Sequence, residues 1–402
     1  MSTTSIPPEP STQGFVFHAT GREYFKIWIV NLALTIVTLG IYAAWAKVRT
    51  RKYLYQSTEL NQQRFDYHGD PKAILKGNLL VAGVFLAYFL SATFAPALSV
   101  LIMLGVLGAL PWVLVSSLRF HLANSSHCHL RFRFDGKVGK AYKELGIAFA
   151  TMLGVFLAIA IVSSITGALS ILDMEADGSW LGVLLSVVAA LVGFAYIVST
   201  FHTRLRLFVV NHSRFGNAEF GCTLRADSVC KMLLKAWLVC TLLVLAIGMA
   251  VGALGAGIMG GLGALASGEG FPQGEQLGAT MILGAMTFAG VFYFLLFGVG
   301  VYVKTALDNL AWNLTTLDGI HQFQSTASPL KASGIYLSNL LLIVLTVGLF
   351  TPFAKIRMMR YRLKHTAFKP TGTTHAIVQA QQHTQKAYGD SVGDALGMEV
   401  AL

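Results

Sequence analysis

Three long stretches with almost no charge restrict the fold of this chain more than any other feature. They are residues 77–118, 145–203 and 236–303. A transmembrane helix needs about 20 apolar residues, and each stretch is at least twice that length. The few charges inside them are all acidic: Asp173, Glu175, Asp177, Glu269 and Glu275. Each stretch is therefore expected to form a hairpin of two transmembrane helices with a neutral or acidic turn outside.

The basic residues predict the orientation of these hairpins. All 30 Lys and Arg residues lie outside the three stretches, and the connections 47–76, 119–144 and 204–235 are basic. Basic loops remain on the cytoplasmic side of a membrane. Charged residues make up 12% of the chain, about half the usual share of a soluble domain. The net charge of +11 then favours anionic lipid headgroups as partners of the protein and argues against nucleic acid.

A second feature is a motif that occurs near both ends of the chain, with an offset of 308 residues. In each copy an apolar run is broken by Thr-x-Gly and closed by a basic tail. The matching residues are Asn31, Thr38, Gly40, Lys47 and Arg49 in the first copy and Asn339, Thr346, Gly348, Lys355 and Arg357 in the second. In each copy, Gly and Lys are seven residues apart, which is only about 10 Å of helix.

The topology of the two end runs, 26–46 and 335–355, has two solutions. If both crossed the membrane, basic residues such as Arg22 and Lys364 would lie outside, against the pattern of the rest of the chain. We therefore expect an all-α polytopic membrane protein with six transmembrane helices in three hairpins. Two Thr-x-Gly-broken segments, re-entrant or interfacial, complete it, with both termini cytoplasmic. The alternative is that the two runs span fully, giving eight spans.

The cytoplasmic connections are expected to carry short β-strand caps. In Arg131-Phe132-Arg133-Phe134 the two Phe and the two Arg residues alternate, as on a half-buried strand, and 64–67 and 15–17 look similar. The expected organisation is a disordered N-terminus (1–14), one membrane domain (15–369) and a polar cytoplasmic tail (370–402). Within the domain the end motif occupies 24–55 and 332–365. The first 14 residues lack the features of a cleavable signal.

No chemistry-bearing motif stands out. His121, His127, Cys128 and His129 are the most metal-like cluster. On one strand, however, His127 and His129 would face one side and Cys128 the other, so they would form a basic face with the neighbouring arginines. Neither a hydrolase elbow nor a phosphate-binding loop occurs. We expect no cofactor, no metal and no enzymatic activity.

The end motif resembles one known family. Thr38-Leu-Gly40-Ile-Tyr42, then Trp45-Ala-Lys47-Val-Arg49, and the copy ending Pro352-Phe-Ala-Lys355-Ile-Arg357 are similar to the YjgN-like family of bacterial inner-membrane proteins (domain of unknown function 898). The likeness extends over nearly the whole chain. The first copy lacks the Pro of the motif, having Ala44 before Trp45, and the second has Phe353 instead of Trp. The resemblance implies a multi-pass inner-membrane protein and supplies no catalytic residues.

The candidate substrate- or lipid-binding residues all come from the end motif. They are Asn31, Thr38, Lys47, Arg49, Asn339, Thr346, Lys355 and Arg357. An Asn in hydrocarbon needs a partner, which is either a substrate or a group of its own helical hairpin. The basic residues either bind an anion or extend to the headgroups.

Two functions remain open. Transport or permeation of a small or lipidic molecule predicts a polar cavity lined by Asn31 and Asn339. A non-catalytic membrane-organising or anionic-lipid-binding role predicts a filled interior with a basic rim. Self-association as a homo-oligomer is compatible with both.

Overall fold

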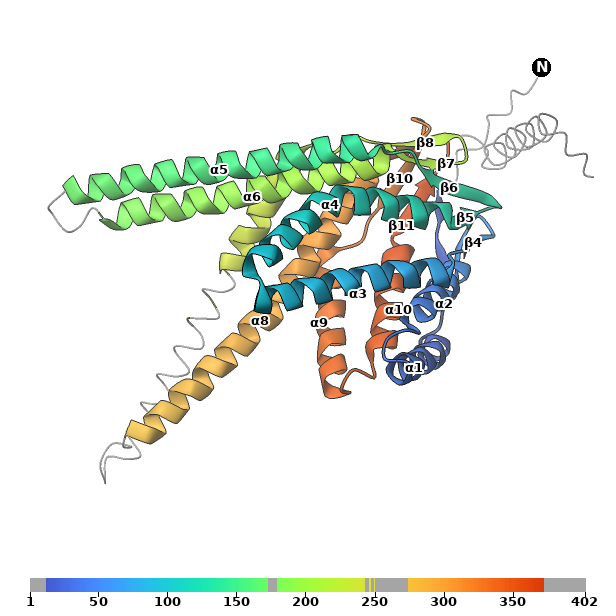
Figure 1. The fold of residues 1–402 in the computed structure, drawn as a ribbon, viewed down its shortest axis with the longest axis horizontal. Helices are drawn as coiled ribbons and strands as arrows, with labels where there is room; N and C mark the ends of the chain where they lie inside the picture. The colour runs from blue at the N-terminus through green and yellow to red at the C-terminus, as the bar shows by residue number, and fades with distance from the viewer. Residues whose placement is uncertain (1–11, 173–178, 243–245, 247–248, 250–273, 372–402) are drawn as a thin grey trace, which may run out of the picture.

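The computed structural model describes residues 12–172, 179–242, 246, 249 and 274–371. Its strands gather at one end, and its helices extend away from them (Figure 1). The helices are α1 (Gly21–Val37), α2 (Ala43–Gln56), α3 (Pro71–Phe94), α4 (Pro96–Ala123), α5 (Val138–Leu172), α6 (Ser179–Asn211), α8 (Gly274–Asn313), α9 (Pro329–Leu345) and α10 (Thr351–Lys364). Residues 226–242 are also helical.

The strands form one closed antiparallel sheet instead of separate caps. They are β1 (Gln13–Gly14), β2 (Val16–Phe17), β3 (Thr58–Leu60), β4 (Gln63–Tyr67), β5 (Ser125–His127), β6 (Leu130–Phe134), β7 (Ser213–Phe215), β8 (Ala218–Cys222), β9 (Thr315–Leu317), β10 (His321–Ser325) and β11 (Thr366–Lys369). Neighbours in sequence pair from β2 to β11, and β1 pairs with β11. Only Phe15 separates β1 from β2. The single segment 13–17 therefore pairs with β11 at its start and with β3 at its end, which closes the sheet into a barrel. The fold is therefore not all-α.

The segment 13–17 also moves the expected boundary of the N-terminal tail. Gln13 and Gly14, which the sequence places in a disordered tail, form β1 and pair with Phe368 and Ala367. The polar tail predicted for 370–402 lies outside the described residues from position 372 onward.

Four strand pairs are hairpins that each join one helix to the next: β3–β4, β5–β6, β7–β8 and β9–β10. Three of the hairpins turn on two consecutive residues with positive φ: Asn61 and Gln62, Cys128 and His129, and Asp318 and Gly319. Positive φ at both central residues defines a type I′ turn, whose twist matches that of the strands. The expectation that residues 127–133 form one strand with a continuous basic face is therefore wrong, because the chain reverses between His127 and Leu130.

The alternation predicted for β6 is confirmed. Leu130 and Phe134 are buried and Phe132 is partly buried, whereas Arg131 and Arg133 are exposed. The Phe side of the strand faces the inside of the structure and the Arg side faces out, as period-2 patterning requires.

Ten side chains from the strands line the interior of the barrel. Each of the four hairpins contributes two of them, and so does the pair formed by segment 13–17 and β11. Five are Phe at the centre of each longer strand segment: Phe15, Phe65, Phe132, Phe220 and Phe323. Five come from the third position of each shorter strand: Leu60, His127, Phe215, Leu317 and Phe368. Together with Trp312 from α8 they surround a cavity of about 210 Å³. His127 is the single polar residue among the ten.

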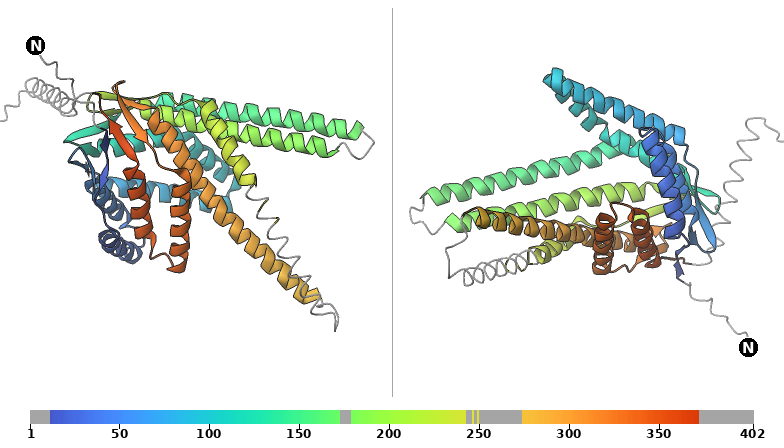
Figure 2. Two further views of the ribbon diagram at one scale, coloured as in Figure 1. Left: turned by 180° about the vertical axis from the view of Figure 1, so that it is seen from behind. Right: turned by 90° about the horizontal axis from the view of Figure 1, so that it is seen from below.

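The helices form pairs that fan out from the barrel (Figure 2). Five described helical segments are long and apolar enough to cross a membrane: Pro71–Phe94, Pro96–Ala123, Val138–Gly167, Gly182–Asn211 and Phe292–Asn313. The sixth predicted span, within 232–263, lies largely outside the described residues. Between 6% and 22% of each apolar window is buried, so almost all of this apolar surface faces outward, where lipid chains would cover it.

The two end runs are short helical pairs. α1 and α9 have 17 residues each, and α2 and α10 have 14. Neither run is one continuous helix, because each breaks at Thr-x-Gly. α1 also packs against α10, with Phe25 and Phe353 in ring contact at 5.6 Å, so the two end motifs are neighbours in space.

Candidate functional site

The predicted asparagines each join the two helices of their own pair. Asn31 is buried and its Nδ2 donates to the carbonyl of Ala46 at 3.5 Å. Asn339 is also buried and donates to the carbonyl of Ala354 at 3.2 Å, while its Oδ1 accepts from Arg357 at 3.1 Å. Neither asparagine lines the barrel cavity or the pocket between α5 and α6 described below. Each asparagine therefore bonds to the backbone of the second helix of its own pair.

The predicted threonines form the Thr-x-Gly turns. Thr38 Oγ1 donates to the carbonyl of Leu34 and accepts from the backbone N–H of Tyr42. Thr346 makes the same two contacts, with Leu342 and Phe350. Each hydroxyl is therefore engaged at both its donor and its acceptor side.

The basic residues of the motif differ between the two copies. Lys47 and Arg49 are exposed. Lys355 contacts the Tyr24 hydroxyl at 3.3 Å and lies over its ring, and Arg357 bonds to Ser338 and Asn339. The structure thus brings together Arg357 and Asn339, but the eight predicted residues do not converge on one site.

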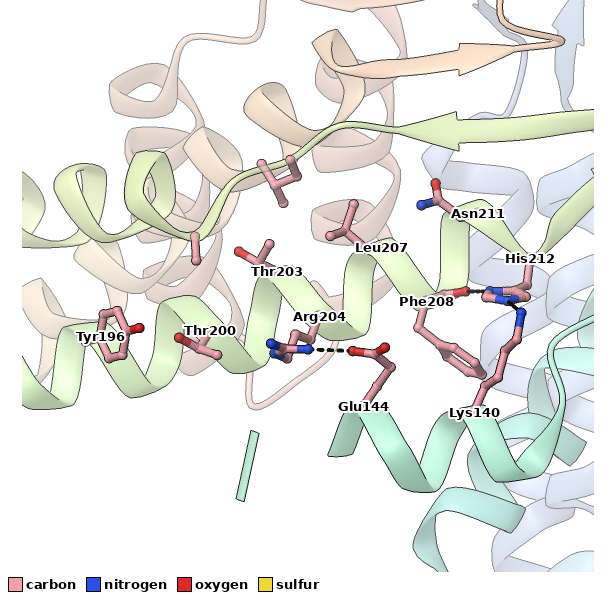
Figure 3. Close-up of a pocket in the computed structure, with 12 residues that line it drawn as sticks. Lys140, Glu144, Tyr196, Thr200, Thr203, Arg204, Leu207, Phe208, Asn211 and His212 are labelled. Carbon is pink, nitrogen blue, oxygen red and sulfur yellow. Dashed lines mark hydrogen bonds and ion pairs between the residues drawn. The ribbon is translucent and has the colours of Figure 1, made fainter. Parts of the chain in front are cut away.

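A pocket that none of the eight predicted residues lines lies between α5, α6 and the start of the helix at 226 (Figure 3). Its volume is about 530 Å³. Lys140 and Glu144 come from the first turns of α5, and a row along α6 contributes Thr200, Thr203 and Arg204. Both sets lie where the α5–α6 pair meets the barrel.

Charged groups form one wall of this pocket. Arg204 Nη1 donates to Glu144 at 2.9 Å, and both side chains are about one third exposed. His212 Nδ1 lies 2.9 Å from the carbonyl of Phe208. A carbonyl only accepts, so Nδ1 carries the proton and Nε2 accepts from the Lys140 ammonium at 3.3 Å. Lys140 therefore supplies a positive charge that Glu144 does not neutralise.

Two buried hydroxyls form another part of the lining. Thr200 and Thr203 are 7% and 4% exposed, and neither Oγ1 has a hydrogen-bond partner among the described residues. Buried polar groups are normally paired. Two unpaired hydroxyls beside a cationic wall can satisfy the oxygens of an anionic ligand, to which hydroxyls donate.

A signal for this pocket was present in the sequence. Lys140 and Glu144 precede the charge-poor stretch 145–203, and Thr203-Arg204 closes it. If that stretch is a hairpin, its two flanks lie side by side on one face of the membrane. The i, i+4 spacing of Lys140 and Glu144 then places both on one face of the first helix.

The residues that looked most like metal ligands are dispersed. His127 points into the barrel, where burial lowers its pKa to about 4, whereas His129 is exposed at the hairpin turn. Burial raises the pKa of the Cys128 thiol. Within the described part of the chain, three or more such ligands nowhere come together as a metal site.

The family described as "Bacterial protein of unknown function (DUF898)" matches residues 12–395. The inner membrane protein YjgN of Escherichia coli O157:H7 is 26% identical over 375 residues, which cover 88% of each chain. YjgN of Salmonella typhimurium LT2 is 26% identical over 365 residues and 87% of each chain. YjgN of Escherichia coli K12 is 36% identical over 130 residues, 31% of each chain. No solved structure matches.

The relatives are named inner membrane proteins, and this chain carries several apolar helices of membrane-spanning length. Because the family match extends over nearly the whole chain, this protein belongs to the DUF898 family of bacterial proteins.

Proposed function

We propose that this protein is a non-catalytic, multi-pass inner-membrane protein that binds phosphate-bearing, anionic lipid headgroups. The observation that carries the proposal is the pocket of α5 and α6, where Lys140 and Arg204 lie beside the unpaired hydroxyls of Thr200 and Thr203. A phosphate would accept from both hydroxyls and from the cationic groups. The ion pair with Glu144 uses Nη1 of Arg204, so the guanidinium has further N–H groups to offer.

The surroundings of the pocket suit a lipid better than a soluble anion. α5 and α6 carry exposed apolar side chains over their length, among them Phe149, Phe156 and Val192. A headgroup in the pocket would leave its acyl chains along this surface. The charged headgroup would then contact the polar pocket, and the acyl chains would contact the adjacent apolar surface of α5 and α6.

The membrane arrangement that fits this proposal has three transmembrane hairpins and two interfacial ones. The barrel and both termini would lie in the cytoplasm, because the basic connections form the hairpins of the barrel. The tips of the two short helical pairs, α1–α2 and α9–α10, are suited to insertion into the membrane interface. Leu39 and Val347 are 94% and 93% exposed, although both are large and apolar. Such tips bury apolar surface in the headgroup region.

Permeation is the second candidate. The observation that favours it is the closed barrel, whose inward-facing side chains surround a cavity. The polar cavity lined by Asn31 and Asn339 that transport would need is not among the cavities described above. Lipid binding therefore has the stronger support.

The test is lipid binding by the full-length protein in detergent, followed by native mass spectrometry. Dioleoyl phosphatidylglycerol is compared with dioleoylglycerol, which has the same chains and lacks phosphate. Wild type should prefer the phospholipid. Lys140→Ala should weaken its binding about fivefold, the effect of one cation near a headgroup. Thr203→Val, which removes one hydroxyl at nearly constant volume, should weaken binding about threefold.

The matched control is Lys143→Ala, because Lys143 is exposed on the same helix and does not line the pocket. Its affinity for phosphatidylglycerol should remain at the wild-type value. If Lys143→Ala weakens binding as much as Lys140→Ala, lipids bind through general surface charge and the proposed pocket is wrong.

A further inference from the structure

The barrel interior contains one residue that does not match its nine counterparts. At the third position of the shorter strands, four of the five residues are Leu or Phe, namely Leu60, Phe215, Leu317 and Phe368. The fifth is His127, which is 8% exposed. A Leu or Phe at this position evidently fits the barrel, so packing alone does not require an imidazole.

The imidazole of His127 is held between aromatic rings. Its ring centroid lies 4.3 Å from that of Phe65, with 24° between the planes, and 6.2 Å from that of Phe215. Burial keeps the ring neutral at physiological pH, since its pKa is lowered to about 4. The neutral ring has one donor and one acceptor nitrogen.

The hydrogen bonds of His127 leave one nitrogen unused. A backbone hydrogen bond with Arg64 raises the pKa of the ring, as a carbonyl does when it accepts from imidazole N–H. Nδ1 is buried and has no partner in the part of the chain described. Because Nδ1 has no partner, the donor to the carbonyl is assigned to Nε2, which leaves Nδ1 as the acceptor nitrogen of the neutral ring.

The cavity is large enough for a ligand. Its volume is about 210 Å³, and it opens to the outside of the barrel. An apolar protein cavity of about 150 Å³ is known to stay dry and to bind benzene. Aromatic rings line most of the wall, with neighbouring centroids such as those of Phe220 and Phe323 at 6.0 Å. Rings at this spacing interact through offset or edge contacts, which favour another flat ring as the occupant.

We infer that the barrel interior is a binding chamber for a small, flat aromatic molecule with one hydrogen-bond donor, of the size of phenol or indole. The donor of this molecule bonds to Nδ1 of His127, and its ring packs among the inward-facing Phe side chains. This chamber is separate from the lipid pocket of α5 and α6, and its occupancy does not depend on that pocket.

The experiment compares indole with indene, which has nearly the same shape but lacks the N–H donor. Binding to the full-length protein in nanodiscs is measured by equilibrium dialysis, with empty nanodiscs as the blank for partition into lipid. Wild type should bind indole about three- to tenfold more tightly than indene, the effect of one hydrogen bond to a buried neutral acceptor. Binding of neither compound above the blank would overturn the inference.

Two variants locate the site. His127→Phe introduces a residue already present at this position in other strands, and it should bind indole and indene equally. Leu317→Trp fills the chamber and should bind neither. A preference for indole that persists in His127→Phe, or wild-type indole affinity in Leu317→Trp, would contradict the proposed chamber. If Leu317→Trp does not fold, the comparison of indole with indene in His127→Phe still decides.

Discussion

Asn31 and Asn339 occupy equivalent places in the two short helical pairs, but their hydrogen bonding differs. Asn339 is bonded through both its amide nitrogen and its oxygen. Asn31 has one long bond, and its Oδ1 has no partner in the described structure. Ser338 helps to hold Arg357 beside Asn339, whereas the corresponding residue of the first pair is Val30. Without that hydroxyl, Arg49 lacks the second contact that positions its counterpart.

This difference predicts unequal effects of two identical substitutions. Asn339→Ala should lower the free energy of unfolding by about 1–3 kcal/mol, because it removes two bonds and leaves buried groups unpaired. Asn31→Ala should cost less than about 1 kcal/mol, since it also removes an unpaired buried oxygen. Unfolding of detergent-solubilised protein in dodecyl sulfate, followed by circular dichroism, measures both. An equal or larger loss for Asn31→Ala would show that the first pair relies on its Asn just as strongly.

Apolar surroundings indicate that Asn31 and Asn339 need partners, and one of the two expected kinds of partner is found. Which carbonyl accepts, Ala46 or Ala354, depends on a turn geometry that no residue type specifies. The pocket of Lys140 and Arg204 was missed because its members are about 60 positions apart, and only a folded hairpin brings them together.

The helical elements of the end motif are separated by strained turns. Leu39 and Gly40 have φ values of 50° and 92°, and Val347 and Gly348 have 49° and 90°. A β-branched residue such as Val347 rarely adopts positive φ. The strain falls on residues whose side chains are almost fully exposed, at the tips that we propose to enter the membrane interface.

Gly348→Ala should therefore destabilise the protein by about 1–2 kcal/mol, the cost of placing a Cβ in a left-handed conformation. The matched control is Gly334→Ala in α9, where no atom lies within 4 Å of the added Cβ. Alanine there should stabilise the helix by about 0.5–1 kcal/mol. Thermal unfolding of both variants in the same detergent tests the pair of effects. Similar stability changes of the same sign would mean that the turn carries no strain.

At the level of elements, alternation and apolar length are the informative signals. Alternation of apolar and basic residues predicted β6, and the length of the apolar stretches predicted the paired long helices. The hairpin turn at Cys128 and His129 could not be anticipated, because neither residue is a usual type I′ turn former. The surrounding strands impose the positive φ values there, so tertiary structure overrides local preference.

For the whole molecule, the proposed orientation predicts which faces an impermeant thiol reagent can reach in intact cells. The four native cysteines are first replaced, and single cysteines are placed at Arg22, Asn61 and Ala95. Ala95 lies between α3 and α4, at the end of a pair far from the barrel. Only Ala95→Cys should react before permeabilisation. Labelling of Arg22→Cys from outside would instead support eight full spans.

The sequence pattern did not predict that the strands close into a barrel. The segment 15–17 looked like a single unmatched strand. The adjoining residues 13 and 14 pair with β11, which contains only one Phe, Phe368. Neither half identifies the other, because the two halves of this strand pair stand at opposite ends of the chain. The pairing follows from geometry. The four hairpins leave one gap in the barrel, and the segment 13–17 fills it together with β11.

That pairing has a consequence for biosynthesis. Gly14 and its partner Ala367 are 353 positions apart, and a ribosome adds about 5–20 residues per second. Strand β1 therefore waits on the order of 20–70 s for its partner β11, and an unpaired strand edge attracts other chains. Barrel closure can occur only near the end of translation. The first strand segment to leave the ribosome is then the last to find both of its neighbours.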